Sequence, residues 1–558
     1  MDPTIHQPAM PDQFSSLYAE LLDWTYDCTD RIVLNARFPL GRDGGGMRFW
    51  WRQLCGSEEE LDTHHLMRMA GRFSRRLRAY CQAHGIPVQD CAAGQQKWKI
   101  AQEHLSSQEV RRGLFLVLVS RAPAPVWEVK KSRQGGHIAT LRQKKPWPYV
   151  KHYSFHIMDP DWGHLVIKMS GHPPFGAQII LNGHEYVACQ AAKKGIVFRK
   201  EGNCFVQATS ATALGAVADT LGTESAIGLL RQVCERWIYT TCLCFALDLD
   251  EQQRSGFRYV YSTYQGEYSR NYHFRSGRHL EQVVQGLIER TRGPLRLDQI
   301  KTVFGSKHRP SRRKLDQQRY ESVVETPEYD VTVFKVHYGN LTLKIYTKGE
   351  RTLRIEVVVH NTKQLGAVKR LERFPRIIAR LREILRRFTE VVRCMDASFV
   401  ADDLLERLPE PSQVGNTKVG GMDINKPRMR RLMGAALALS SLPQGFTVSE
   451  VVAKVGQAAD PSACAYGPRQ AAYDLRKLRS KGLMERISNS RRYAVTWTGL
   501  RTLTALFVLR DKVIRPLLAN AGQRKRGARP AHTTALDRCY ETLQVGMQGL
   551  FQELGIAA

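Results

Sequence analysis

The densest group of residues that could carry out chemistry lies between Tyr153 and Ile196. Histidine, aspartate and glutamate recur there at short spacing, and these side chains bind metals or move protons. If the acids met a histidine in the fold, the site could bind Mg²⁺ or Mn²⁺ and cleave nucleic acid. The candidate catalytic residues are Asp159, Asp161, His164, His184 and Glu185.

A purely structural interpretation accounts for the same residues. The run from Asp159 to Gly163 (DPDWG) has the composition of a turn between two alternating segments, which predicts a β-hairpin. Asn182 with Glu185 three residues later is typical of a helix N-cap and its reciprocal partner, and Gly195 is placed to end that helix. Both interpretations stay open at this point, and no metal ligand is assigned.

The net charge indicates the class of partner. The chain has 558 residues, with 83 Lys and Arg against 53 Asp and Glu, and a formal charge of +30. Such an excess favours a polyanion, most often nucleic acid. No apolar run approaches the roughly 20 residues that cross a bilayer, and the polar N-terminus is not typical of a secretory signal. We therefore expect a cytoplasmic, nucleoid-associated protein with no membrane partner.

The 12 cysteines show no metal-binding or disulfide framework. The closest pair, Cys242 and Cys244, does not have the spacing of a C-x-x-C hook. We expect reduced, mostly buried thiols and no structural zinc. Mg²⁺ or Mn²⁺ would be needed only if the protein is a nuclease.

The stretch from Tyr466 to Trp497 predicts a helix followed by a two-stranded hairpin. Pro468 suits the first helical position, and Gly482 can end the helix in a left-handed conformation. Apolar residues at helical spacing predict a buried stripe along the helix. This stripe consists of Ala472, Leu475 and Leu478.

The opposite side of this helix is polar and cationic, as is the tip of the hairpin. Phosphate attraction dominates affinity for nucleic acid, so this surface is suited to a groove of a duplex. A domain that docks only to protein is the alternative. The residues expected at the nucleic acid are Arg469, Gln470, Tyr473, Arg476 and Lys477 on the helix, and Arg491 and Arg492 on the hairpin.

Further elements are predicted before this helix. Helices are expected near Pro427–Leu442 and Ser449–Val455, with a short strand at 446–448 between them. The order helix, strand, helix, helix and hairpin, over about residues 423–520, resembles the winged helix-turn-helix of small bacterial transcription regulators. The resemblance implies a domain that binds DNA.

The segment Tyr320–His360 predicts an antiparallel meander with turns at Gly339-Asn340 and Lys348–Arg351. Its pattern Lys-x-Tyr-x-Lys, then Leu-Arg-x-Glu, is similar to strands in replication initiators of phages and rolling-circle plasmids. The paired His-hydrophobic-His motif of those initiators is missing here. Arg354 and Glu356 could alternatively form a cross-strand ion pair. The residues expected at nucleic acid here are Lys344, Lys348 and Arg354.

A second basic stretch runs from Ala122 to Lys151 and is interleaved with aromatic residues, among them Trp147 and Tyr149. Aromatic rings and cations together suit single-stranded nucleic acid, through stacking and phosphate contact. A solvated loop is the alternative. Lys144 and Lys145 are the cations expected to bind.

Most of the chain resembles an uncharacterised bacterial family of multidomain proteins. The shared residues are the hairpin Tyr153–Met169, the LNGH motif Leu181-Asn182-Gly183-His184, Tyr346-x-Lys348, Leu353-Arg354-x-Glu356 and the C-terminal winged helix. The resemblance implies one multidomain unit and transfers no activity.

These patterns predict an α+β multidomain protein: a helical N-terminal region, a mixed α/β body with antiparallel sheets, and a C-terminal winged helix. Helices are expected at Ser16–Thr29 and Glu58–Ala83, with a flexible turn at Gly44–Gly46. The terminal helix could mediate homo-oligomer contact. The expected regions are 1–110 (helical), 111–151 (strand and basic aromatic loop), 152–408 (body), 409–422 (linker), 423–522 (winged helix) and 523–558 (basic hinge and terminal helix).

The function expected from the sequence is nucleic-acid binding of the replication, recombination or mobile-element kind, with DNA favoured over RNA. One alternative is a metal-dependent endonuclease. The other is an RNA-binding component of a ribonucleoprotein.

Overall fold

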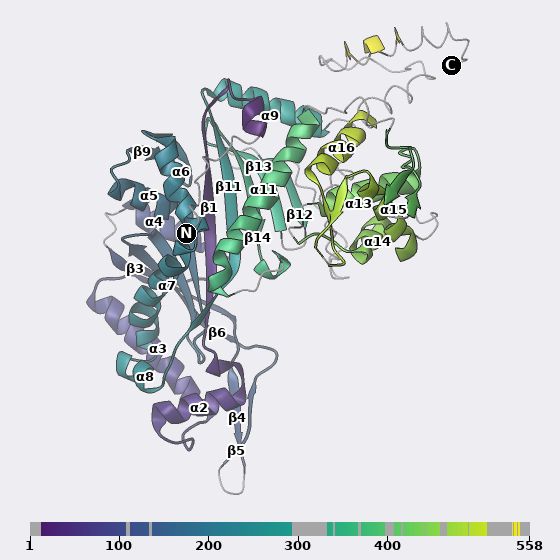
Figure 1. Cartoon of the computed structure of the whole chain (residues 1–558). Coiled ribbons are helices and arrows are strands. Elements are labelled where there is room, and N and C mark those ends of the chain that lie inside the picture. The colour runs from purple at the N-terminus through teal and green to yellow at the C-terminus, as the bar shows by residue number, and fades with distance from the viewer. Residues whose placement is uncertain are drawn as a thin grey trace, which may run out of the picture. The chain divides into compact units, whose positions relative to one another are not determined.

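The chain forms two compact units, and Figure 1 labels their helices and strands. The first, here called the sheet unit, contains residues 24–271 and 356–382. The second, here called the C-terminal unit, contains residues 1–23, 272–355 and 383–558. This computed structural model describes residues 13–107, 112–132, 137–292, 332–338, 341–365, 370–396, 407–414, 417–440, 442, 444–457, 466–488, 490–510, 538–539, 541–543 and 545–546.

One large sheet contains ten strands: β1 (Leu22–Arg37), β2 (Val88–Asp90), β3 (Gly113–Pro123), β6 (Tyr149–Asp159), β7 (Gly163–Ser170), β8 (Ala177–Asn182), β11 (Val260–Phe274), β12 (Thr332–Tyr338), β13 (Leu341–Lys348) and β14 (Thr352–Val359). Their order is β12-β13-β14-β11-β1-β8-β7-β6-β3-β2. The pairs β1–β8, β6–β7 and β7–β8 are antiparallel, whereas β2 and β3 run parallel. The predicted α+β class is confirmed.

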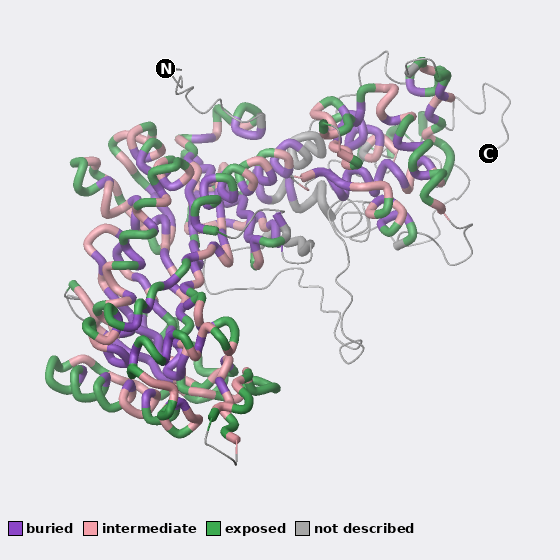
Figure 2. The backbone as a smooth tube through the Cα atoms, turned by 60° about the horizontal axis from the view of Figure 1, so that its bottom comes forward, coloured by how far each residue is buried: buried purple, intermediate pink, exposed green. Residues whose placement is uncertain are grey.

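The longest helix of the sheet unit is amphipathic and buries its apolar face. Helix α3 (Thr63–Ala83) buries Leu66, Met69, Phe73 and Leu77 at helical spacing, and Phe73 stacks on Tyr153 of β6 with ring centroids 4.6 Å apart. Figure 2 shows the buried residues along the strands and the inner faces of the helices. The other helices here are α2 (Gly44–Cys55), α4 (Lys97–Ser107), α5 (Gly183–Lys193), α6 (Ala211–Asp219), α7 (Ser225–Trp237) and α8 (Leu249–Arg254).

The predicted helix at Ser16–Thr29 is wrong. A short helix, α1 (Gln13–Leu17), precedes strand β1, which starts at Leu22 and pairs with β8 from Arg31 to Ala36. The apolar spacing of the first residues fits either a helix or a strand. Pairing with β8, about 150 residues later in the chain, selects the strand.

The predicted flexible turn at Gly44–Gly46 is also wrong, because these glycines form the first turn of α2. The carboxylate of Asp43 caps the helix by accepting the Gly46 amide at 2.8 Å. A Cβ on Gly46 would lie 2.4 Å from the Leu40 carbonyl oxygen, so the absent side chain permits the close approach.

Local turn and capping signals agree with the structure. Asp159 faces Gly163 across the β6–β7 turn, and Gly163 has a φ of 61°. The side chain of Asn182 caps α5, and Gly195, just after this helix, has a φ of 71°. The meander β12–β14 lies where the sequence predicts it, although the turn at 339–340 lies outside the described residues.

The C-terminal unit has the predicted order of elements. Helix α13 (Pro427–Leu439) precedes α14 (Val448–Gln457) and α15 (Pro468–Ser480); the hairpin β17 (Met484–Arg486) and β18 (Tyr493–Val495) leads into α16 (Trp497–Val508). The predicted strand at 446–448 is reduced to an isolated bridge from Phe446 to Tyr493, because α14 already begins at Val448. Helix α9 (Gly277–Arg292) also belongs to this unit, and α11 (Phe374–Asp396) has residues in both.

The predicted linker at 409–422 contains a small hairpin, β15 (Ser412–Val414) and β16 (Thr417–Val419). Val419 and Met422 are fully buried, and the Met422 amide donates to the Leu408 carbonyl at 2.7 Å. The sequence predicts a linker here, and the structure shows that this linker contains a hairpin and buried apolar side chains.

The remaining predictions concern the C-terminal residues, the cysteines and membrane-spanning helices. The predicted basic hinge (523–529) and most of the terminal helix at 533–554 lie outside the described residues, so the homo-oligomer prediction stays open. Ten cysteines are described, and none of these ten forms a disulfide. In the described chain, no helix has both the length and the apolar character to cross a bilayer.

Candidate functional site

The two aspartates of the predicted catalytic group are tied into a structural turn. One carboxylate oxygen of Asp159 accepts the amides of Asp161 and Trp162 at 2.8 and 2.9 Å. Its other oxygen accepts Arg236 and the Trp237 indole N–H, both at 2.7 Å. This hydrogen bonding satisfies Asp159 with protein groups alone.

Arg236 also bonds Asp161, at 2.9 Å, and Lys193 forms a second ion pair with that carboxylate. The hydrogen bond from Lys193, together with Arg236, holds the pKa of Asp161 below its ordinary value. Both carboxylates are therefore already neutralised by cations of the protein. The prediction that Asp159 and Asp161 bind Mg²⁺ or Mn²⁺ with a histidine is not supported by this geometry.

The other predicted catalytic residues have separate partners. His164 lies beside His156, with a nitrogen–nitrogen distance of 3.1 Å. Glu185 forms an ion pair with Lys200, so its predicted role as a capping partner of Asn182 is wrong. Among the described residues, the cluster able to hold a metal ion is a different one, Cys28, Asp30 and His184.

Burial of the His156–His164 pair predicts that acid destabilises the sheet unit. Burial lowers the pKa of His156 to about 3 and also lowers that of His164. The unfolded chain takes up a proton on each near pH 6.5, whereas the folded chain does so only at lower pH. The free energy of unfolding should therefore fall between pH 6.5 and about 3, at up to about 1.4 kcal/mol per pH unit for His156.

Denaturant unfolding at pH 7.5 and 5.5 measures this effect. We expect His156→Phe to lose less stability on acidification than the wild type, because its ring takes up no proton. His64→Phe, at an exposed position on α3, is the control and should keep the wild-type difference. Equal pH dependence in all three proteins would contradict the prediction.

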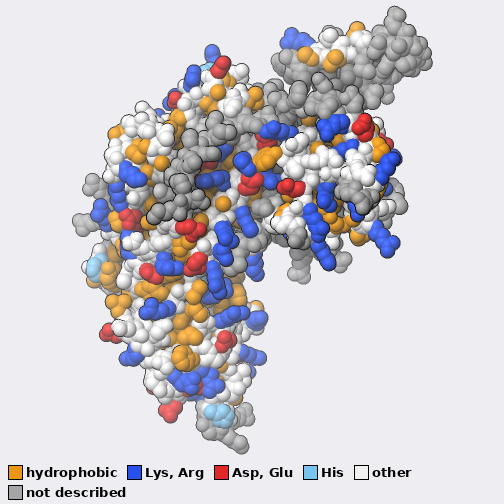
Figure 3. All heavy atoms as spheres, in the orientation of Figure 1, with side chains coloured by type: hydrophobic (Ala, Val, Ile, Leu, Met, Phe, Trp, Pro, Cys, Tyr) orange, Lys and Arg blue, Asp and Glu red, His pale blue; other side chains and the backbone are white. Residues whose placement is uncertain are grey.

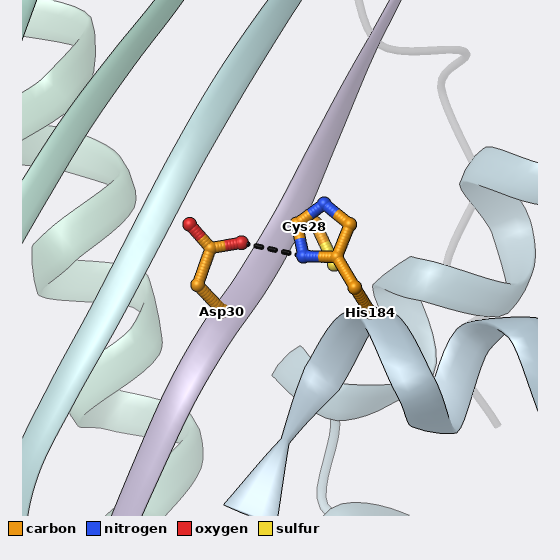
Figure 4. A group of neighbouring side chains, drawn as sticks. All are labelled: Cys28, Asp30 and His184. Atoms are coloured by element: carbon orange, nitrogen blue, oxygen red, sulfur yellow. Dashed lines mark ion pairs between the residues drawn. The ribbon is translucent and has the colours of Figure 1, made fainter. Parts of the chain in front are cut away.

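The LNGH motif brings His184 against strand β1. The Asn182 side chain accepts the His184 amide at 2.9 Å and so starts helix α5. His184 is fully buried, and its Nδ1 lies 2.7 Å from Oδ1 of Asp30. Figure 4 shows this pair with Cys28, which lies two residues before Asp30 on β1. Residues two apart on a strand face the same side, so Cys28 and Asp30 both point toward α5.

Further polar groups surround this cluster. The Ser269 hydroxyl donates to Asp30 Oδ1 at 3.1 Å, and Asn271 donates to Ser269 Oγ at 3.2 Å. On the other side of the imidazole, the Tyr26 hydroxyl lies 3.4 Å from His184 Nε2 and accepts the Phe205 amide at 2.9 Å. The alternation of Tyr26, Cys28 and Asp30 was the signal in the sequence, and the wrong prediction of a helix obscured it.

Helix α15 has two distinct faces. Ala471, Leu475 and Leu478 are buried, whereas Ala472 is exposed, which corrects the predicted stripe by one position. Asp474 is also buried, and it accepts Arg428 at 3.0 Å and the Tyr466 hydroxyl at 3.1 Å. The exposed residues are Arg469, Gln470, Tyr473 and Arg476.

Two of the cations predicted to contact nucleic acid, Arg492 and Lys477, donate hydrogen bonds to backbone carbonyls. The Arg492 guanidinium donates to the carbonyls of Gln444 and Gly445 at 2.8 and 2.9 Å, so it ties the hairpin to the segment before α14. Lys477 donates to the Gly421 carbonyl at 2.9 Å. Both side chains therefore stabilise the fold, and their contact with nucleic acid stays a prediction, as does that of Arg491, which is exposed.

The predicted cations of the β13–β14 region are less accessible than expected. Arg354 is 2% exposed, because β14 is buried on both of its faces, so its prediction as a phosphate contact is wrong. Lys344 and Lys348 are half-buried, and the Lys344 ammonium lies over the Tyr346 ring at 5.8 Å.

A basic-aromatic patch lies on the sheet unit. Trp147 and Tyr149 are 48% and 69% exposed, and Lys144 and Lys145 are exposed before them. Lys151 and Arg121 are cross-strand partners on β6 and β3, and both are exposed. The patch is defined as Arg121, Lys144, Lys145, Trp147, Tyr149 and Lys151. Figure 3 shows Lys and Arg side chains spread over the face it draws.

Comparisons with protein-family models, curated proteins and solved structures found no match to this chain. The resemblance to a bacterial family therefore stays a prediction, and the geometry above carries the functional argument.

Proposed function

We propose that this protein binds nucleic acid, with duplex DNA as the main ligand, through the exposed face of α15 and the β17–β18 hairpin. The observation that carries the proposal is the division of α15 into a buried apolar face and a face of exposed Arg469, Gln470 and Arg476. A formal charge of +30 on the whole chain favours the same class of ligand.

The residue types on this face suit both parts of DNA recognition. Arginine can bind guanine with two hydrogen bonds, and glutamine can bind adenine in the same way. Cations that contact phosphates fix the position of the protein and give salt-dependent affinity. The order of elements supports interpretation of the domain as a winged helix, with α15 in the major groove and Arg491 beside the backbone. The protein would then belong to the replication, recombination or mobile-element kind.

Fluorescence anisotropy with labelled duplex DNA, duplex RNA and single-stranded DNA over a range of salt concentrations tests the proposal. We expect tightest binding to duplex DNA, with the logarithm of the affinity falling linearly with that of the salt concentration. Tighter binding to RNA would favour the ribonucleoprotein alternative. No binding to any of the three at low salt would refute the proposal. DNase and RNase sensitivity of co-purified nucleic acid gives an independent measurement.

The basic-aromatic patch favours a second contact, with single strands. Stacking of a base on an exposed ring contributes about 1–3 kcal/mol, and neighbouring cations bind the phosphates. We expect the double variant Trp147→Ala and Tyr149→Ala to bind single-stranded DNA about tenfold or more weakly, with duplex affinity little changed.

Trp98→Ala is the matched control, because Trp98 on α4 is 60% exposed and lies outside the patch. It should leave single-strand affinity unchanged. An equal loss in Trp98→Ala, or none in the double variant, would remove the patch from the proposal.

The geometry does not support the nuclease alternative, because Arg236 already forms ion pairs with both candidate aspartates.

A further inference from the structure

A second ligand class is suggested by the buried cluster on β1 and α5. The donor atoms of Cys28, Asp30 and His184 lie within 4.8 Å of one another. The three residues are 1%, 2% and 0% exposed, respectively. Two of them come from neighbouring positions of one strand face and the third from the first turn of a helix, so they are brought together only by the fold (Figure 4).

We propose that Cys28, Asp30 and His184 bind a divalent cation of the zinc class, which fastens α5 to β1. Thiolate, imidazole and carboxylate are the three donor types that proteins use for zinc. The thiolate disfavours Mg²⁺ and Ca²⁺, which prefer all-oxygen sites. Three protein ligands leave one tetrahedral position for water or for the second oxygen of Asp30.

The charges balance when the ion is bound. The Cys28 thiol must lose its proton to become a ligand, and this proton passes to the solvent buffer. The thiolate and the Asp30 carboxylate then carry two negative charges, which the ion neutralises, and His184 is neutral. A buried site with no net charge avoids most of the cost of placing an isolated ion in the interior.

The distances require a small adjustment. Asp30 Oδ1 and His184 Nδ1 are 2.7 Å apart, which is a hydrogen-bond length. A tetrahedral ion bonded to each at about 2.0–2.2 Å would hold them roughly 3.3–3.5 Å apart, so the two atoms must separate by less than about 1 Å.

Neighbouring hydrogen bonds orient Asp30 and His184. The hydroxyl of Ser269 donates to Asp30, and Asn182 holds the first turn of α5 that carries His184. Because all three ligands are buried, the ion would have no open path to a nucleic-acid phosphate. Its role would be structural, and the site is distinct from the predicted nuclease group at Asp159 and Asp161.

The first test uses the wild-type full-length chain. Protein purified without chelators from zinc-supplemented cells should contain one equivalent of zinc by mass spectrometry. After the zinc is exchanged for Co²⁺, the absorption spectrum should show a thiolate-to-cobalt charge-transfer band and tetrahedral ligand-field bands. This measurement requires no variant, so it decides the proposal even if substitutions prevent folding.

The second test compares two buried cysteines of the same region. Cys28→Ala and His184→Ala should lose the zinc and the characteristic cobalt spectrum. Cys204→Ala should retain both, because Cys204 is equally buried beside Tyr26 but outside the ligand group. Less than a tenth of an equivalent of zinc in the wild type, even after incubation with Zn²⁺, would overturn the proposal. The same zinc content in the wild type and Cys28→Ala would also overturn it, because exposed thiols such as Cys55 would then be the ligands.

Discussion

Replacement of Arg469 and Arg476 by alanine should weaken the binding of duplex DNA at least about 30-fold. Each specific arginine contact contributes about 1–3 kcal/mol, and each 1.4 kcal/mol is a factor of ten in affinity. Both side chains are exposed on α15 and neither belongs to its buried face, so their removal should leave the helix folded. The slope of affinity against salt should also flatten, by about 0.9 for each phosphate that the variant no longer neutralises.

A charge-matched control separates a specific contact from general attraction. Arg199→Ala with Arg231→Ala removes the same two charges from the sheet unit, at side chains 60% and 48% exposed. This control should bind duplex DNA with nearly wild-type affinity. If both double variants lose the same affinity, the α15 face is not the contact and net charge alone accounts for binding. Circular dichroism of both proteins should match that of the wild type.

Arg492→Ala would be a poor test of the same surface. Its guanidinium holds the carbonyls of Gln444 and Gly445, so its loss would disturb the hairpin itself. From the sequence alone, Arg491 and Arg492 are equally good candidates for nucleic-acid contacts. Neighbouring arginines in a turn cannot be separated by type or spacing, since their roles depend on backbone carbonyls supplied by another segment.

The elements that sequence reasoning found correctly are those with local causes. The β6–β7 hairpin follows from the turn chemistry between Asp159 and Gly163, and α5 follows from its Asn182 cap. Helix α15 starts at Pro468 and ends just before Gly482 for equally local reasons. In each of these places the physical cause lies within a few residues of its effect.

The elements that were missed have distant causes. Strand β1 exists because Arg31 to Ala36 pair with β8, and nothing near Leu22 distinguishes this strand from a helix. The alternation of the strand sequence predicts that Arg354 lies on an exposed face, but β14 is buried on both faces. The Cys28–Asp30–His184 cluster is hard to predict for two reasons. Two of its members lie on β1, whose first half the sequence predicts as a helix, and the third lies more than 150 residues later.

Gly183→Ala should destabilise the sheet unit by about 3–5 kcal/mol, an effect that few single substitutions reach. A Cβ at this position would lie 1.7 Å from the Thr29 carbonyl oxygen and 3.2 Å from a Leu221 methyl group. The carbonyl belongs to strand β1, so it cannot move away without disturbing the sheet. The helix must move instead, and it would carry His184 away from Asp30.

Gly228→Ala is the matched control, because Gly228 is an exposed residue of α7 and its Cβ would meet nothing within 4 Å. Alanine favours a helix over glycine, so this variant should equal the wild type or exceed it by up to about 1 kcal/mol. Denaturant unfolding followed by circular dichroism measures both. A Gly183→Ala protein within about 0.5 kcal/mol of the wild type would mean that α5 does not lie against β1 at van der Waals distance. The contact between Asp30 and His184, and the metal site built on it, would then lose their basis, because that close approach is what places the imidazole beside the strand.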